Sequence, residues 1–187
     1  MRKLLFKSFV QGPLTEAAPA SSDEAIAELA ARVNLVSRKR LGRTLAIREV
    51  DAGSCNGCEL EIHALSNVLY DLERFGLRFV ASPRHADVLL VTGPVTANMR
   101  EALERTYQAT PDPKWVVAVG DCARDGGIFA GSRACVGGVS QVLPVDLHIR
   151  GCPPSPIVLL KGLLALLESV STDAPQHISR TGNEEEK

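Results

Sequence analysis

Short runs of aliphatic and β-branched residues alternate along the chain with longer segments in which apolar residues recur at helical spacing. The short runs predict strands at 44–50, 77–81, 86–93, 115–120 and 142–149. The longer segments predict helices at 59–73, 99–108 and 155–169. This βαβ order predicts an α/β fold with a doubly wound, mostly parallel sheet and helices on both faces, for which the flavodoxin-like arrangement is the natural candidate.

The two ends of the chain differ in pattern from this central part. The stretch 1–22 contains "GPLTEAAPASS", which offers little to bury and predicts an N-terminal arm and linker. A helix is expected after it, because Ser21 and Glu24 have capping-box spacing ahead of an apolar stripe. The stretch 171–187 has no apolar periodicity and predicts a disordered tail. We therefore expect one domain over 23–170.

Composition and charge exclude several classes of protein. The chain has 187 residues and a formal net charge of -1, which argues against a nucleic-acid partner. The opening "MRKLLFKSFV" is too short and broken for a signal peptide, so a cytoplasmic location is expected, although this amphipathic arm would suit a membrane surface or a membrane subunit. Five cysteines in a cytoplasmic chain favour metal binding or redox chemistry over structural disulfides.

Four of the five cysteines follow predicted strands. Cys55 and Cys58 come after the first strand, Cys122 after "WVVAVG", and Cys152 after "VDLHIRG". The carboxyl ends of parallel strands meet at one edge of the sheet, where doubly wound proteins bind their ligands. Residues far apart in the sequence are therefore expected to converge.

Four converging thiolates are suited to a tetrahedral metal ion or to an iron–sulfur cluster. Structural zinc sites usually use two C-x-x-C pairs, whereas this chain has one pair and two single cysteines, which favours a cluster. Structural zinc and uncoordinated thiols remain open on spacing alone. Cys135, in "GSRACVGGV", is not counted as a ligand, because a lone cysteine is more often a small buried apolar residue.

Together, the motifs "CNGCE", "SPRHADVLLVTGPVT", "VVAVGDCARDGGIF" and "RGCPPSP" resemble a known family. The chain is similar to the small, iron–sulfur subunit of membrane-bound group 4 [NiFe] hydrogenases of the formate hydrogenlyase type. The same family includes the 20 kDa subunit of complex I, the respiratory NADH-quinone oxidoreductase. The resemblance covers roughly residues 44–168, in the expected order.

The resemblance implies a flavodoxin-like fold and one [4Fe-4S] cluster, with Cys55, Cys58, Cys122 and Cys152 as ligands to its iron. Complex I relatives have two adjacent cysteines where this chain has Cys55-Asn56-Gly57-Cys58, and this departure favours the hydrogenase branch. A second departure is Asp121, where hydrogenlyase relatives carry a small uncharged residue. An anion at this position would lower the potential of a cluster.

The resemblance also implies a function and partners. We expect a subunit of an oxidoreductase complex, not catalytic alone, that relays electrons between ferredoxin-like clusters and the nickel site of a large subunit. The expected partners are that large [NiFe] hydrogenase-type subunit, a ferredoxin-like 2x[4Fe-4S] subunit and integral membrane subunits, at the cytoplasmic side of the cell membrane. The alternatives are a quinone-reducing subunit like that of complex I and a zinc-stapled binding module without redox function.

Glu59 follows a predicted ligand directly and has two explanations. In hydrogenase relatives a Glu at this place is thought to lie near the proton path, which predicts proton transfer by Glu59. The ordinary explanation is that its charge suits the start of the following helix. His63 lies one helical turn further along the same face, where a surface contact is the commoner role than proton relay.

Overall fold

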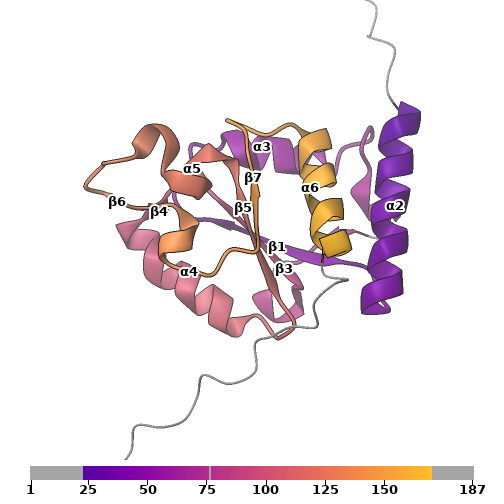
Figure 1. Cartoon of the computed structure of the whole chain (residues 1–187), viewed down its shortest axis with the longest axis horizontal. Helices are drawn as coiled ribbons and strands as arrows, with labels where there is room; N and C mark the ends of the chain where they lie inside the picture. The colour runs from indigo at the N-terminus through magenta and orange to yellow at the C-terminus, as the bar shows by residue number, and fades with distance from the viewer. Residues whose placement is uncertain (1–22, 76, 170–187) are drawn as a thin grey trace, which may run out of the picture.

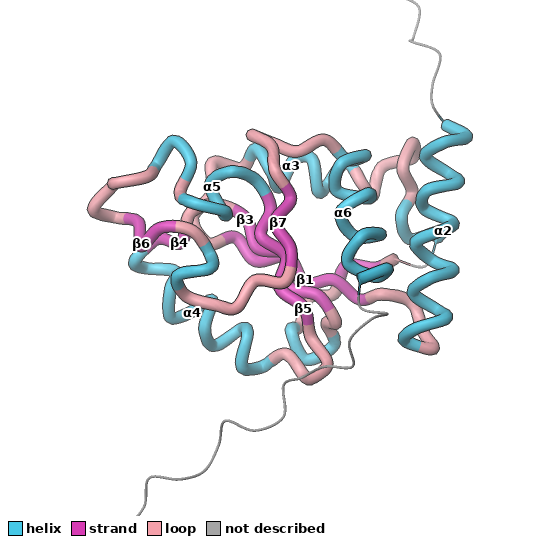
Figure 2. Tube along the Cα trace, viewed as in Figure 1, coloured by secondary structure: helices cyan, strands magenta, loops and turns pink. Residues whose placement is uncertain are grey.

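The computed structural model describes residues 23–75 and 77–169, and within them a parallel sheet lies between two layers of helices (Figures 1 and 2). The strands of this sheet are β1 (Ala46–Asp51), β2 (Arg78–Phe79), β3 (Val88–Thr92), β5 (Trp115–Val119) and β7 (Leu147–Ile149). Their order is β2-β1-β3-β5-β7, and every neighbouring pair is parallel. This is the flavodoxin-like order, so the predicted fold class is confirmed.

Each face of the sheet has its own apolar core. The central strand β3 is buried along its whole length, and its residues alternate between the two cores. Val88 and Leu90 pack with α2 (Asp23–Leu41), α3 (Gly57–Ala64) and α6 (Pro156–Ser169). The other face, with Leu89 and Val91, is covered by α4 (Ala97–Ala109) and α5 (Gly120–Asp125). Burial on both faces explains why the strand sequence is continuously apolar.

The helix predicted over 59–73 is shorter in the structure. α3 ends at Ala64, and the 3-10 helix η1 (Leu72–Phe75) follows after a turn. The side-chain oxygen of Asn67 accepts hydrogen bonds from the backbone N–H groups of Leu69 and Tyr70, at 2.9 and 3.1 Å. An Asn that bonds to its own backbone in this way competes with helix formation.

The strand predicted over 142–149 is also shorter, because β7 begins only at Leu147. The residues before it form the 3-10 helix η4 (Val139–Gln141) and a turn. The carboxylate of Asp146 accepts a hydrogen bond from the Val116 N–H at 2.7 Å, which fixes the entry into β7 beside β5.

The remaining elements are short. A two-stranded antiparallel sheet joins β4 (Val95–Thr96) to β6 (Cys135–Gly137), and strands this short have no readable sequence pattern. Two further 3-10 helices are η2 (Pro83–His85) and η3 (Gly127–Phe129). The predicted arm at 1–22 and tail at 171–187 lie outside the described residues. Within the described ranges, no helix is long and apolar enough to cross a membrane.

Candidate functional site

The four predicted ligand cysteines lie at the same edge of the sheet, in the loops that follow the strands or in the first turns of the helices after them. Cys55 and Cys58 follow the carboxyl end of β1, Cys122 follows β5 in the short helix α5, and Cys152 follows β7. Cys55 and Cys152 are exposed, Cys58 is half-buried and Cys122 is buried. The topology therefore brings the three loops to one edge, as the strand pattern predicts.

The three loops also touch one another. A Cβ atom built on Gly57 would lie 3.5 Å from the sulfur of Cys55 and 4.0 Å from the ring of Pro153, the residue after Cys152. A Cβ atom on Gly120 would lie 2.7 Å from the sulfur of Cys58 and 3.3 Å from the carbonyl oxygen of Gly151. The loop after β5 is thus packed between the first cysteine pair and the last cysteine loop.

Two glycines make this close packing possible. Gly120 has φ +87°, and any side chain there would collide with the sulfur of Cys58. Gly93, at the carboxyl end of β3, has φ +73°, and a Cβ atom there would come within 2.5 Å of the backbone nitrogen of Ser54. Both positions keep backbone close to the cysteine loops, so these glycines shape the edge without contributing a ligand.

The thiols disfavour each other's ionised form. Burial, followed by the nearby charge of Glu59 and the thiols of Cys122, Cys55 and Cys152, raises the pKa of Cys58 to about 12. Burial also raises the pKa of Cys122, with Cys152 and Cys55 again among the causes. Thiolates at this edge would therefore need a compensating cation, which a bound metal would supply. Cys135, in β6, is not among the groups that act on either thiol.

The described residues do not form the ligand shell of a single metal ion. Among the described residues, no group of three or more His, Cys, Asp or Glu side chains is gathered to hold one metal ion. The donor set is nevertheless soft and sulfur-rich, and its electrostatics call for positive charge, so the residues present fit a redox metal centre with thiolate ligands.

Asp121 links two of the cysteine loops. Its backbone N–H donates to the carbonyl oxygen of Gly151 at 2.9 Å, and its carboxylate accepts a longer bond from the Gly151 N–H at 3.4 Å. The same carboxylate oxygen lies 3.7 Å from the guanidinium of Arg124. The Asp121 carboxylate expected beside the cysteines is thus present, and the guanidinium of Arg124 lies close to it.

Glu59 is buried without a visible partner. It stands in the first turn of α3 with 7% of its surface exposed, and neither carboxylate oxygen has a hydrogen-bond partner within the described part of the chain. Its position at a helix start is favourable for a negative charge, as the ordinary explanation requires. Burial of an unpaired carboxylate is costly, so the helix start alone does not account for it.

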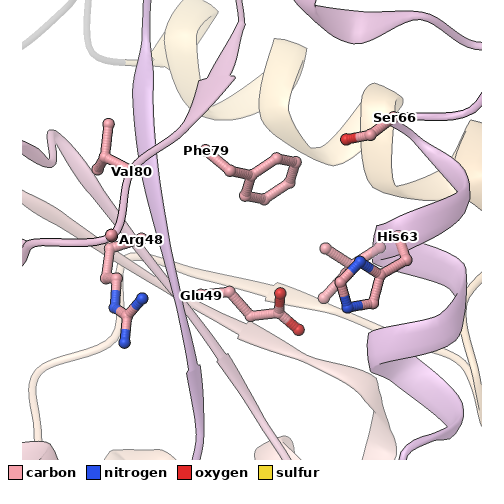
Figure 3. Close-up of a pocket in the computed structure, with 8 residues that line it drawn as sticks. Arg48, Glu49, His63, Ser66, Phe79 and Val80 are labelled. Carbon is pink, nitrogen blue, oxygen red and sulfur yellow. The ribbon is translucent and has the colours of Figure 1, made fainter.

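A cavity of about 260 Å³ lies beside α3, and no sequence motif predicts it (Figure 3). It is lined by Arg48, Glu49, Ile62, His63, Ser66, Phe79, Val80 and Ala81. Burial raises the pKa of Glu49, an effect that Glu59 strengthens and His63 weakens. The only sequence signal is the charged pair Arg48-Glu49 inside the strand "AIREVD".

Comparison with known proteins identifies a family match over the region of the cysteine loops. Residues 55–166 match the family described as NADH ubiquinone oxidoreductase, 20 Kd subunit. This segment includes all four predicted ligand cysteines and begins at the first of them.

Among curated proteins, the chain is similar to subunits of hydrogenase complexes. It is 45% identical to formate hydrogenlyase subunit 7 of Escherichia coli K12 over 153 residues, which are 80% of this chain and 58% of that protein. It is 45% identical to the probable membrane-bound hydrogenase subunit mbhJ of Pyrococcus furiosus over 133 residues, or 71% of this chain and 80% of that protein. The chain therefore spans little more than half the length of the first of these relatives.

Solved structures give the same picture of the fold. A chain of the archaeal membrane-bound sulfane sulfur reductase is 34% identical, with a TM-score of 0.62 and coverage of 75% of both chains. A chain of the NAD+-reducing [NiFe]-hydrogenase is 24% identical, with a TM-score of 0.55 and coverage of 74% of this chain and 99% of that one. The second likeness is informative for the fold alone.

Proposed function

The chain belongs to the family of the NADH ubiquinone oxidoreductase 20 Kd subunit, and from this premise we propose that it is the electron-transfer subunit of a membrane-associated [NiFe] hydrogenase. The family is one of oxidoreductase subunits, which confirms the predicted resemblance and the predicted class of protein. The finer proposal is that the chain carries one [4Fe-4S] cluster and relays electrons to the nickel site of a large subunit.

The observation that carries this proposal is the convergence of three cysteine loops at the carboxyl edge of the sheet. Cys55, Cys58, Cys122 and Cys152 would each hold one iron of the cluster, and the chain's own glycines let the cysteine loops approach one another. A cluster binds its four cysteines through different irons, so the sulfurs are spaced more widely than around one ion. This spacing is compatible with the missing single-ion shell among the described residues.

When bound, such a cluster supplies one-electron transfer. The protein residues fix its position, with Gly120 and Gly93 allowing the loops to approach and Asp121 joining the loops of Cys122 and Cys152. Glu59, unpaired among the described residues and next to Cys58, is proposed to transfer protons between this edge and the active site of the large subunit.

The partners and location follow from the same proposal. A relay needs a donor and an acceptor that both dock near the cysteine edge, so we infer a large [NiFe] subunit there and a ferredoxin-like 2x[4Fe-4S] subunit on a second surface. Attachment to integral membrane subunits would hold the chain at the cytoplasmic side of the membrane. The relatives named as a membrane-bound hydrogenase subunit and a respiratory membrane complex support this inference.

Two other electron acceptors compete with the nickel site. Complex I-like quinone reduction is disfavoured by Asn56 and Gly57, which separate the first two cysteines. Sulfane sulfur reduction is the activity named for a relative at 34% identity. Electron paramagnetic resonance of the anaerobically purified complex distinguishes them from hydrogenase activity. We expect dihydrogen to reduce the cluster as dithionite does, and a cluster that dithionite reduces but dihydrogen does not would overturn the proposal.

A further inference from the structure

The cavity beside α3 places ionisable side chains from two elements opposite one another. Glu49 comes from β1, and His63 and Ser66 come from the end of α3 and the turn after it. Figure 3 shows the Glu49 carboxylate and the His63 ring both reaching into the space between strand and helix, while Arg48 extends to the other side of the strand. Phe79, Val80 and Ala81 line the wall and carry no ionisable side chain.

Glu49 lines the cavity and Glu59 does not, but the charge of Glu59 acts on Glu49, and both carboxylates have oxygens without a hydrogen-bond partner among the described residues. One carboxylate oxygen of Glu49 is buried without a hydrogen-bond partner among the described residues, and both oxygens of Glu59 are in the same situation. Water is the usual partner for such groups when space is available. A cavity of about 260 Å³ has room for several water molecules, since one needs only about 10–15 Å³ of such space.

The exposed fraction of the side chain differs among Glu59, Glu49 and His63. Glu59 has 7% of its surface exposed, Glu49 is half-buried and His63 is exposed. Glu59 and His63 are four residues apart on α3, so both lie on one side of the helix. His63 and Glu49 therefore line the cavity between solvent and the buried strand, and Glu59 is close enough for its charge to act on Glu49.

The charges that face Glu49 come from two elements. From α3, His63 lowers and Glu59 raises the pKa of Glu49, and from β1 itself Arg48 lowers it and Asp51 raises it, while burial is the largest cause and raises it. A carboxyl whose protonated form is favoured by burial, and which lines a cavity beside a histidine, is suited to accept and release a proton.

We propose that this cavity is a water-filled proton entry, in which Glu49 and His63 exchange protons between solvent and the Glu59 end of α3. The inference rests on the proposed function and extends it to two new residues. His63 passes a proton from solvent to cavity water, and the Glu49 carboxylate accepts this proton and becomes a carboxylic acid. The acid then gives the proton to water on the Glu59 side, so both groups return to their starting forms and no electron moves along this route.

Turnover measurements on the whole complex test the route. We expect Glu49→Gln and His63→Ala each to slow hydrogen turnover by about tenfold or more, with reduction of the cluster by dithionite unchanged. Added imidazole should restore turnover in His63→Ala, which a purely structural defect would not allow. The matched control is His148→Gln, an exposed histidine on β7, which should turn over normally. Normal turnover in both cavity variants would overturn the proposal.

Infrared difference spectroscopy of the full, cluster-loaded chain gives a readout that does not need hydrogen turnover. Lowering the pH should produce a carboxylic-acid carbonyl band that shifts in heavy water and is missing in Glu49→Gln. If the complex does not use hydrogen but this band is present and assigned to Glu49, the proposed function fails while the proton site stands. A spectrum that Glu49→Gln leaves unchanged would contradict the site itself.

Discussion

Two buried carboxylates at opposite edges of the sheet differ in their hydrogen-bond partners. Asp87 lies just before β3, where it accepts two hydrogen bonds from the guanidinium of Arg43 and one from the Ala46 N–H at 2.9 Å. Glu59 lies beyond the carboxyl end of β1, similarly buried, and neither of its oxygens has a partner in the described ranges. The buried carboxylate at the amino edge, Asp87, therefore has hydrogen-bond donors, whereas the one at the carboxyl edge, Glu59, has none among the described residues.

This difference separates structural from functional polar groups. At the amino edge, Asp87 ties the start of β3 to β1, and Asp146 holds the Val116 N–H in the same way near β7. At the carboxyl edge, burial and the neighbouring acidic groups disfavour the ionised form of the Cys58 thiol, and Glu59 has oxygens without a partner among the described residues, as has Glu49 within β1. Proteins rarely leave buried polar groups unpaired without a further partner, so the carboxyl edge is where a metal centre, water and another subunit are expected.

Among the variants that test this difference between the two edges, Glu59→Gln is expected to have the largest effect, on hydrogen turnover. If Glu59 transfers protons, this variant should slow hydrogen turnover about 100-fold, or about 2.7 kcal/mol in the barrier, while the cluster is still reduced by dithionite. Its free energy of unfolding should not fall, because Glu59 makes no hydrogen bond to the described residues that the change could remove. Unchanged turnover would leave Glu59 with only its favourable position at a helix start.

At the amino edge, a substitution is expected to change the free energy of unfolding. Asp87→Ala should lower the free energy of unfolding by about 2 kcal/mol, because it leaves the buried Ala46 N–H without its acceptor. Urea unfolding of the full chain measures this, with Asp112→Ala on an exposed loop as the control. A loss of stability no larger than that of the control would mean that Asp87 does not anchor β3 to β1.

The smallest effect concerns the pH dependence of stability at Glu49. Because burial raises the pKa of Glu49 above its ordinary value of 4.5, the folded chain keeps this proton at pH values where the unfolded chain has released it. The free energy of unfolding should therefore fall as pH rises through this window. Urea unfolding at several pH values should give a flatter profile in Glu49→Gln, and parallel profiles would argue against a buried Glu49 carboxyl.

The fold was largely predictable because its signals are local. The continuous apolar run around β3 and the βαβ order led to the correct sheet, and the cysteines after three strands led to one edge. The end of α3 was predicted wrongly, because the side chain of Asn67 turns the backbone and no periodicity reports it. The start of β7 was predicted too early, because Asp146 bonds to the neighbouring strand just before β7 begins.

Parts of the site were beyond prediction because they depend on packing. Glu49 and His63 are 14 positions apart and meet only because α3 folds back along β1, so no motif joins them. The resemblance identified the family correctly, yet the ligand set, the single cluster and the proton role of Glu59 are still predictions. The sequence analysis also missed that Arg124 lies three residues after Asp121 on α5, where its cation would reduce the effect of the Asp121 anion on the potential of a cluster.

The central claim is that the four cysteines at the carboxyl edge hold one [4Fe-4S] cluster. Iron and sulfide analysis of the anaerobically purified chain, together with electron paramagnetic resonance after reduction, tests it most directly. We predict iron and sulfide in the equal amounts that such a cluster requires, a signal that is lost in Cys122→Ala and Cys152→Ala, and a normal signal in Cys135→Ala. Bound zinc without sulfide, or a normal signal in Cys152→Ala, would contradict the claim.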